Sequence, residues 1–264
     1  SCDGTLAQEN TGSLTRMRVR KISEQQDSFG LTHTTVVLSF PASVTYSATD
    51  PADAPEPVNF KPWSPEHPWL YPFTLNADED TVDGYFAMRC FSVEKDSKGI
   101  LRFCLNHKPY FLHGILDQGY WSDGLMTAPC DEAFVYDISL AKGLGFNMLR
   151  KHIKLESLRW YYHCDKLGLI VWQDMVNGGG PYKLWFVTYL TNVFQPLLRR
   201  LPDARPLWGL LGRETEAGRE EYARELEATV KTLQCHPCVG CWVPFNEGWG
   251  QFDAAGAVEA VRRL

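Results

Sequence analysis

The sequence contains no apolar run of the roughly 20 residues needed to cross a bilayer. It also has no excess of basic residues, because 26 Lys and Arg stand against 32 Asp and Glu, a net charge of −6. That balance gives no sign of a basic binding surface, so we expect neither nucleic acid nor an anionic membrane as a partner. The opening residues, SCDGTLAQEN, do not show the basic and then apolar order of a signal peptide.

Two cofactor signals are also incomplete. The glycine-rich residues 177–180 are not followed by the Lys and Ser or Thr of a phosphate loop, which indicates a turn. Cys235, Cys238 and Cys241 have metal-ligand spacing, but a zinc ribbon needs a second CxxC pair, which the sequence does not contain. We therefore expect buried thiols, no metal and no cofactor. Scattered thiols among apolar neighbours favour a reduced, cytoplasmic protein, while a secreted or periplasmic location stays open.

Aromatic residues are abundant, at 13% of the 264 residues, with 9 Trp, 11 Tyr and 14 Phe. Their flat faces suit the C–H side of sugar rings, although a large core also uses them. A hydrophobic content of 44% is that of a globular protein with ample core. The length predicts one large domain or two ordinary ones.

Residues 1–95 have a β pattern without helical periodicity. Residues 14–22 alternate between apolar and polar side chains, as in a half-buried strand. Residues 34–40 and 81–93 are further β-rich runs. Residues 51–72 carry seven prolines, which cannot donate to a central sheet ladder, so we expect a loop or edge path there. This pattern predicts a small β-sandwich domain.

Residues 96–264 alternate between strand and helix patterns. The expected strands are residues 110–115, 146–150, 169–172 and 239–245, and the expected helices are residues 131–143, 156–167, 214–233 and 251–264. A long insertion after the third strand includes a weaker helical pattern at 184–198. Alternation of this kind predicts βα units around a parallel sheet. Four units are present, whereas a closed (β/α) barrel has eight.

The most informative stretch is CWVPFNEGWG, residues 241–250. Its apolar half is typical of a buried parallel strand, and Asn246 and Glu247 follow at the strand's carboxyl end, between two tryptophans. In parallel α/β folds that end forms the active-site rim, so Glu247 is a candidate for acid–base chemistry. The alternative is a solvated Glu at the start of a helix. Asp174 lies at the end of the third strand, and Asp117 lies at the end of the first. For each of them, substrate contact and a structural role such as helix capping remain alternatives.

Six short motifs follow one another in the order that glycoside hydrolase family 2 shows. In chain order they are PWSPEHPWLY at 62–71, DGYFAMR at 83–89, NHKPYFLHG at 106–114, NMLR at 147–150, CDKLGLIVW at 164–172, and Asn246-Glu247. The second motif has Ala87 where the family usually has Gly. The chain resembles this family, the β-galactosidase, β-glucuronidase and β-mannosidase group, over roughly residues 58–260.

The resemblance implies an immunoglobulin-like β-sandwich at 1–95, followed at 96–264 by the N-terminal part of a TIM (β/α)8 barrel. It implies retaining hydrolysis by two carboxylates about 5–5.5 Å apart. Glu247 would be the acid/base, Asn246 would bind the 2-hydroxyl, and Arg150 would lie near the nucleophile. Trp249 would form part of the sugar-facing wall.

Other features depart from the family pattern. The family's nucleophile is a second Glu on barrel strand 7, so none is assigned within residues 1–264. His152, a candidate substrate contact, follows Arg150 by two residues, where some relatives have a His after three.

We predict a glycosidase acting on β-linked sugars, β-galactosidase-like, in carbohydrate metabolism. The alternative is a non-catalytic carbohydrate-binding or structural fragment. Residues 1–264 alone are expected to be inactive and to associate, as a homo-oligomer or otherwise, through unpaired strand edges.

Overall fold

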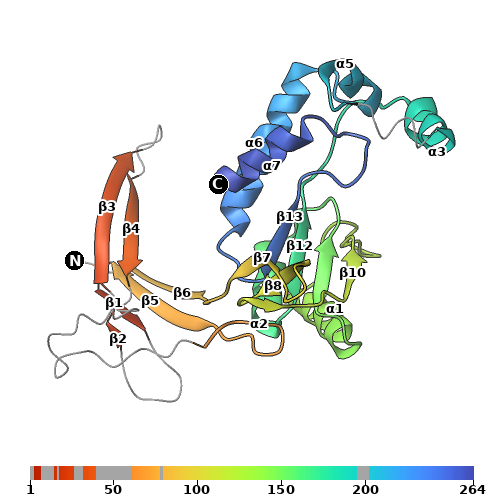
Figure 1. The fold of residues 1–264 in the computed structure, drawn as a ribbon. Helices are drawn as coiled ribbons and strands as arrows, with labels where there is room; N and C mark the ends of the chain where they lie inside the picture. Colours follow the sequence, from red (N-terminus) through yellow and green to blue (C-terminus); the bar gives the residue numbers. More distant parts are fainter. Residues whose placement is uncertain are drawn as a thin grey trace. The chain divides into compact units, whose positions relative to one another are not determined.

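The computed structural model describes residues 3–6, 15–16, 18–26, 32–39, 61–77, 80–194 and 202–264 (Figure 1). The chain forms two compact units. The first comprises Ser1–Trp63 and Trp69–Arg89, and the second comprises Ser64–Pro68 and Cys90–Leu264. Much of the proline-rich stretch lies outside the described residues. In its described part, residues 61–70 contain an isolated bridge between Pro62 and Met88 and otherwise no strand. The prediction of a loop or edge path is wrong at the end of the stretch, because Tyr71 and Pro72 begin a strand that lies inside a sheet.

The first unit is built of antiparallel strands, as the sequence predicts. Its four-stranded sheet has the order β2-β1-β5-β6, and β3 and β4 form a separate hairpin. The strands are β1 (Asp3–Leu6), β2 (Thr15–Arg16), β3 (Arg18–Gln26), β4 (Thr32–Ser39), β5 (Tyr71–Ala77) and β6 (Asp80–Phe86). The strand expected at 14–22 is therefore divided between β2 and β3. An immunoglobulin-like arrangement stays a prediction.

The second unit begins with a three-stranded antiparallel sheet and continues into a parallel one. Strands β7 (Phe91–Lys95), β8 (Leu101–Leu105) and β9 (Lys108–Pro109) form the first sheet. The parallel sheet has the order β10 (Gly114–Asp117), β11 (Met148–Lys151), β12 (Ile170–Asp174) and β13 (Val239–Val243). The predicted order of four parallel strands is confirmed.

Two predicted strand boundaries are wrong. The run at 81–93 is not one strand, because it is divided between β6 in the first unit and β7 in the second. The first parallel strand was expected at 110–115, but it begins at Gly114. Tyr110 instead extends the antiparallel sheet, because its N–H donates to the carbonyl of Phe103 at 2.9 Å.

Helices follow the parallel strands, as expected for βα units. They are α1 (Asp131–Gly143), α2 (Leu158–Leu167), α6 (Glu216–Leu233) and α7 (Ala254–Arg263). The bounds of α1 match the prediction, and its predicted apolar residues Phe134, Ile138 and Ala141 are buried. Figure 1 shows α6 and α7 side by side, and the two helices are in contact. Among the described residues, no helix is both long and apolar enough to cross a membrane.

Gly168 ends α2, as its position in the sequence predicts. Its φ is 77°, in the left-handed region that favours glycine. A Cβ at this position would also lie 2.5 Å from the carbonyl oxygen of Pro65. Lys142 binds the carbonyl oxygens of Leu167 and Pro65, which places a cation at the negative end of α2.

The insertion between β12 and α6 contains four short helical segments in its described residues. They are a π-helix at Trp185–Leu190, α3 (Thr191–Val193), α5 (Arg205–Trp208) and a 3₁₀ turn at Gly209–Leu211. Within the described residues, the helix predicted at 184–198 corresponds to the π-helix and α3, from Trp185 to Val193, and residues 195–201 lie outside the described residues.

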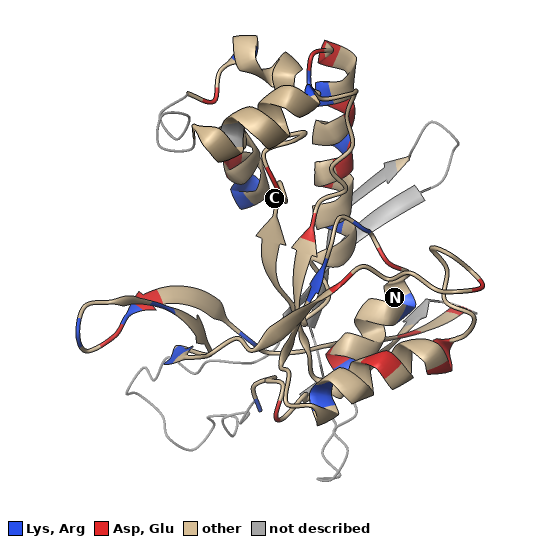
Figure 2. Ribbon diagram, turned by 90° about the vertical axis from the view of Figure 1, so that its right-hand side faces the viewer, with Lys and Arg blue, Asp and Glu red and all other residues tan. Residues whose placement is uncertain are grey.

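Successive side chains of the two central strands, β11 and β12, lie on opposite faces of the parallel sheet. Leu149, Lys151, Val171 and Gln173 are buried on one face. Arg150, in register with Trp172, belongs to the opposite face and is only partly buried. Figure 2 shows the charged residues mostly on helices and loops, with few along the strands themselves apart from their carboxyl ends. Arg150 and Asp174 therefore lie on the same face, at the carboxyl edge of the sheet.

Candidate active site

The carboxyl ends of the four parallel strands bring most of the predicted residues to one edge. Asp117 ends β10, Arg150 lies one residue before the end of β11, and Asp174 ends β12. Asn246 and Glu247 follow β13 after a short turn. Because parallel neighbours end on the same side, these residues share one rim of the sheet.

Arg150 joins three of the strand ends through hydrogen bonds. Its Nε and Nη2 donate to the two carboxylate oxygens of Asp174 at 2.9 and 3.0 Å. Nη2 also donates to Oδ1 of Asn246 at 2.9 Å. The Asp174 side chain is fully buried, whereas 29% of the Arg150 side chain is exposed. A bidentate pair of this kind fixes both partners in one geometry.

This contact also orients the Asn246 amide. A guanidinium group has only donors, so the Asn246 atom that faces Arg150 has to be the carbonyl oxygen. The amide nitrogen, a double donor, is consequently turned away from Arg150. Asn246 can therefore present N–H groups to a hydroxyl of a bound molecule, as the predicted contact with a sugar 2-hydroxyl requires.

Glu247 is exposed, and its Oε2 accepts a hydrogen bond from the Trp249 indole nitrogen at 2.9 Å. Trp249 is itself partly buried. A donor on one carboxylate oxygen leaves the other oxygen to exchange a proton with a ligand. The predicted acid/base residue and the predicted wall residue are thus in direct contact.

The structure does not bring the Asp117 side chain to this group. Its Oδ2 pairs with the Lys151 ammonium at 2.8 Å, and its Oδ1 accepts from the backbone N–H of Gly119 at 2.8 Å. Lys151 follows Arg150 in the strand, so the two side chains lie on opposite faces. Asp117 is engaged on the face away from Arg150, in a structural ion pair.

His152 lies at the end of β11, beside the loop after β10. Its backbone N–H donates to the carbonyl of Asp117 at 2.9 Å, and Gln118 Nε2 lies 3.1 Å from its Nδ1. Because the Gln118 amide nitrogen donates, Nδ1 of His152 is the acceptor. His152 is partly buried at the rim, without a contact to Arg150 among those described.

A buried ionic network next to the rim was missed by the sequence analysis. Lys151 is 1% exposed and contacts Glu156 at 3.2 Å as well as Asp117. Lys154 Nζ lies 2.7 Å from Glu156 and donates to the carbonyls of Gly119 and Met126. These bonds hold the loop after β10. No local sequence pattern predicts that these lysines are buried, because most lysines in proteins are exposed.

The three clustered cysteines contact three separate backbone carbonyls. The thiols of Cys235, Cys238 and Cys241 approach the carbonyls of Thr232, Tyr161 and Trp242. Burial, together with the charge of Asp174, raises the pKa of Cys241, so its thiol stays protonated. Within the described ranges, no group of three His, Cys, Asp or Glu residues is arranged to hold a metal ion.

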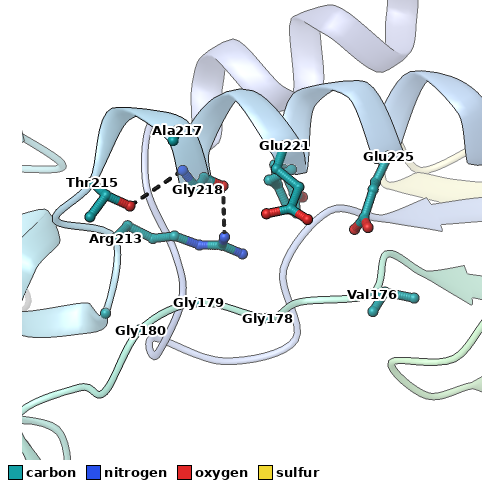
Figure 3. Close-up of a pocket in the computed structure, with 12 residues that line it drawn as sticks. Val176, Gly178, Gly179, Gly180, Arg213, Thr215, Ala217, Gly218, Glu221 and Glu225 are labelled. Carbon is teal, nitrogen blue, oxygen red and sulfur yellow. Dashed lines mark hydrogen bonds between the residues drawn. The ribbon is translucent and has the colours of Figure 1, made fainter.

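A cavity of about 520 Å³ lies between the loop after β12 and the start of α6 (Figure 3). Its lining residues are Val176, Gly178, Gly179, Gly180, Gly212, Arg213, Thr215, Ala217, Gly218, Glu221, Tyr222 and Glu225. Figure 3 shows Glu221 and Glu225 pointing from α6 towards the loop. Arg150, Asp174 and Glu247 do not line this cavity, so it is distinct from the strand-end site.

The insertion holds the loop that carries Glu247. Asn177 Nδ2 donates to the Trp249 carbonyl at 3.0 Å, and Arg213 Nε donates to the Gly250 carbonyl at 2.9 Å. The rings of Tyr182 and Trp249 lie 6.0 Å apart, tilted by 32°. The sequence marked this insertion only as long and glycine-rich, because its contacts join residues more than 30 positions apart.

Comparison with known proteins gives a fold and no family assignment. No family model matches the chain, and no curated protein matches its sequence. Solved structures do match its fold. A Bacteroides uniformis β-glucuronidase has a TM-score of 0.57 at 20% identity over 91% of this chain. A β-galacturonidase of glycoside hydrolase family 2 from Eisenbergiella tayi, bound to galacturonate, has a TM-score of 0.61 at 16% identity over 99%.

A Bacteroides vulgatus β-glycosidase has a TM-score of 0.51 at 17% identity over 91% of this chain. Identities this low show the fold alone. The chain spans 23% of the B. uniformis enzyme, 39% of the E. tayi enzyme and 24% of the B. vulgatus enzyme. Its fold is therefore that of one part of these larger glycosidases.

Proposed function

We propose that the chain is part of a retaining β-glycosidase of glycoside hydrolase family 2. In this proposal the first unit is the immunoglobulin-like domain, and the second contains the first four βα units of a TIM barrel. The observation that carries the proposal is the group of Arg150, Asp174 and Asn246 at the carboxyl ends of parallel strands, followed directly by Glu247. The order of the six motifs and the structural neighbours support it.

Glu247 is the proposed acid/base. It protonates the oxygen of the leaving group and later removes a proton from the attacking water. Asn246, oriented by Arg150, donates to the 2-hydroxyl, a contact that strengthens in the transition state. Asp174 does not fit the role of nucleophile, because it is buried and both its oxygens bind Arg150. We place the nucleophile outside residues 1–264, so this segment alone is expected to be inactive.

Two neighbours support the choice of mechanism and substrate. One is a Bacteroides uniformis β-glucuronidase covalently bound to a cyclophellitol-6-carboxylate aziridine, and a covalent adduct is what a retaining enzyme forms. Another holds galacturonate. We therefore propose a β-O-glycoside substrate and add β-uronides to the β-galactosides that the sequence suggested.

Two further proposals concern the cellular location of the protein and its assembly. The described cysteines are all free thiols, which agrees with a reducing, cytoplasmic setting. β10 and β13 are the outer strands of the parallel sheet in its described order. We propose that these edges pair with further strands of a longer polypeptide or with a second copy of this chain.

The test is the hydrolysis of aryl β-glucuronides, β-galacturonides and β-galactosides by the full-length protein and its Glu247→Gln variant. The variant should lose about a thousandfold on substrates with poor leaving groups and little on activated ones, which need no protonation. Equal losses on both kinds would remove Glu247 from the acid/base role. Binding of sugars without hydrolysis by the full-length protein would favour the non-catalytic alternative.

A further inference from the structure

Trp249 lies between the proposed acid and the insertion. Its indole nitrogen donates to Glu247 at 2.9 Å, and its ring lies 6.0 Å from the ring of Tyr182. Tyr182 is 41% exposed, and Trp249 is partly exposed. Two aromatic rings from segments 67 positions apart thus lie together next to the proposed acid.

The backbone on both sides of Tyr182 is held in place. Gly180 N–H donates to the Gly212 carbonyl at 2.8 Å, and Lys183 N–H donates to the Leu210 carbonyl at 3.0 Å. These two bonds flank Tyr182 in the sequence. A ring whose supporting backbone is already fixed loses little entropy when it binds a ligand.

Arg213 connects the two segments that carry the pair. It is 4% exposed, and its guanidinium donates to the Gly250 carbonyl and to Oδ1 of Asn177 at 2.9 and 2.8 Å. Asn177 in turn donates to the Trp249 carbonyl at 3.0 Å. The insertion and the Glu247 loop therefore form one preorganised wall.

We propose that Tyr182 and Trp249 form the leaving-group subsite and take a second pyranose ring of a β-linked oligosaccharide. This inference rests on the proposed function. A general acid has to touch the leaving oxygen, so the leaving group lies against the side chains that surround the acid. Trp249 is such a side chain, and Tyr182 extends its aromatic surface. Aromatic faces suit the C–H side of a sugar ring, and the Tyr182 hydroxyl adds a hydrogen-bonding group.

The test compares two substrates of the full-length protein with the same cleaved sugar: a β-linked disaccharide and the methyl β-glycoside, whose leaving group needs the same protonation but carries no ring. Tyr182→Ala should lower kcat/KM on the disaccharide about tenfold, the size of one aromatic contact, and leave the methyl glycoside unchanged. Tyr182→Phe should retain most activity on both. Tyr189→Ala, at a 66% exposed tyrosine of the same segment, is the matched control and should have no effect.

Three outcomes would overturn the inference. An equal loss on both substrates would mean that Tyr182 acts by placing Glu247 and does not contact the leaving group. An unchanged disaccharide rate in Tyr182→Ala would mean that no sugar ring binds there. If the unaltered protein hydrolyses neither substrate, nor any other β-glycoside, the proposed function itself fails, and the subsite fails with it.

Discussion

Arg150 and Lys151 are adjacent cations on one strand, yet they serve two different networks. Arg150 is 29% exposed and holds Asp174 and Asn246 at the rim. Lys151 is 1% exposed and pairs with Asp117 and Glu156, with its ammonium 4.0 Å from the centre of the Trp160 ring. Because strand side chains alternate, one step along β11 separates a candidate site from a buried ionic core.

The difference shows how charged residues that stabilise the fold can be told from charged residues that serve a catalytic site. The Lys151 network satisfies its charges within the protein, and the lysines and Glu156 are nearly inaccessible. The Arg150 group also pairs its charges, but it lies beside the partly buried Asn246 and the exposed Glu247. The group that combines fixed geometry with access to a ligand is the better candidate for catalysis.

The largest expected effect is on stability. Lys151→Met removes the ammonium from two carboxylates, and uncompensated buried charge costs about 3–5 kcal/mol in unfolding free energy. Urea denaturation of the protein measures this cost. The double variant Lys151→Met with Asp117→Asn should recover part of it, since one carboxylate is then removed. A Lys151→Met protein as stable as the original would contradict the structural role of this network.

A second pair of variants separates the two faces by activity. Asp174→Asn removes the charged partner that orients Arg150, so kcat/KM on an aryl β-glycoside should fall about 10- to 100-fold. Asp117→Asn makes the same chemical change on the opposite face and should stay within about threefold. If the Asp117 variant is the more impaired, the site has been placed on the wrong face of the sheet.

The smallest expected effect concerns thiols. Burial raises the pKa of Cys164 and of Cys241, and the charge of Asp174 adds to the second. In the unfolded chain these thiols lose their protons above about pH 9, whereas in the folded protein they stay protonated to a higher pH. Their contribution to the free energy of unfolding is therefore fully present below about pH 9 and should decline as the pH rises further. Iodoacetamide labelling followed by mass spectrometry should modify the exposed Cys130 first, Cys241 slowly and Cys164 last. Early labelling of Cys164 would contradict its burial.

Much of the second unit could be predicted from local patterns. The apolar spacing of Phe134, Ile138 and Ala141 predicts the buried face of α1, and Gly168 predicts the end of α2. These features depend on neighbours within one or two turns. The strand boundaries near residues 90 and 110 were wrong, because hydrogen bonds to partners far along the chain decide where a strand begins.

The sequence by itself determined the alternation of strands and helices and the position of Asn246 and Glu247 after the fourth parallel strand, of which only Val239 is buried. Both follow from periodicity and from the order of polar and apolar residues. Only the tertiary structure decided that Arg150 binds Asp174 and that Lys151 is buried. It also decided that Tyr182 lies beside Trp249. The physical reason is that these contacts join distant segments, whose meeting depends on sheet register and on the insertion's path.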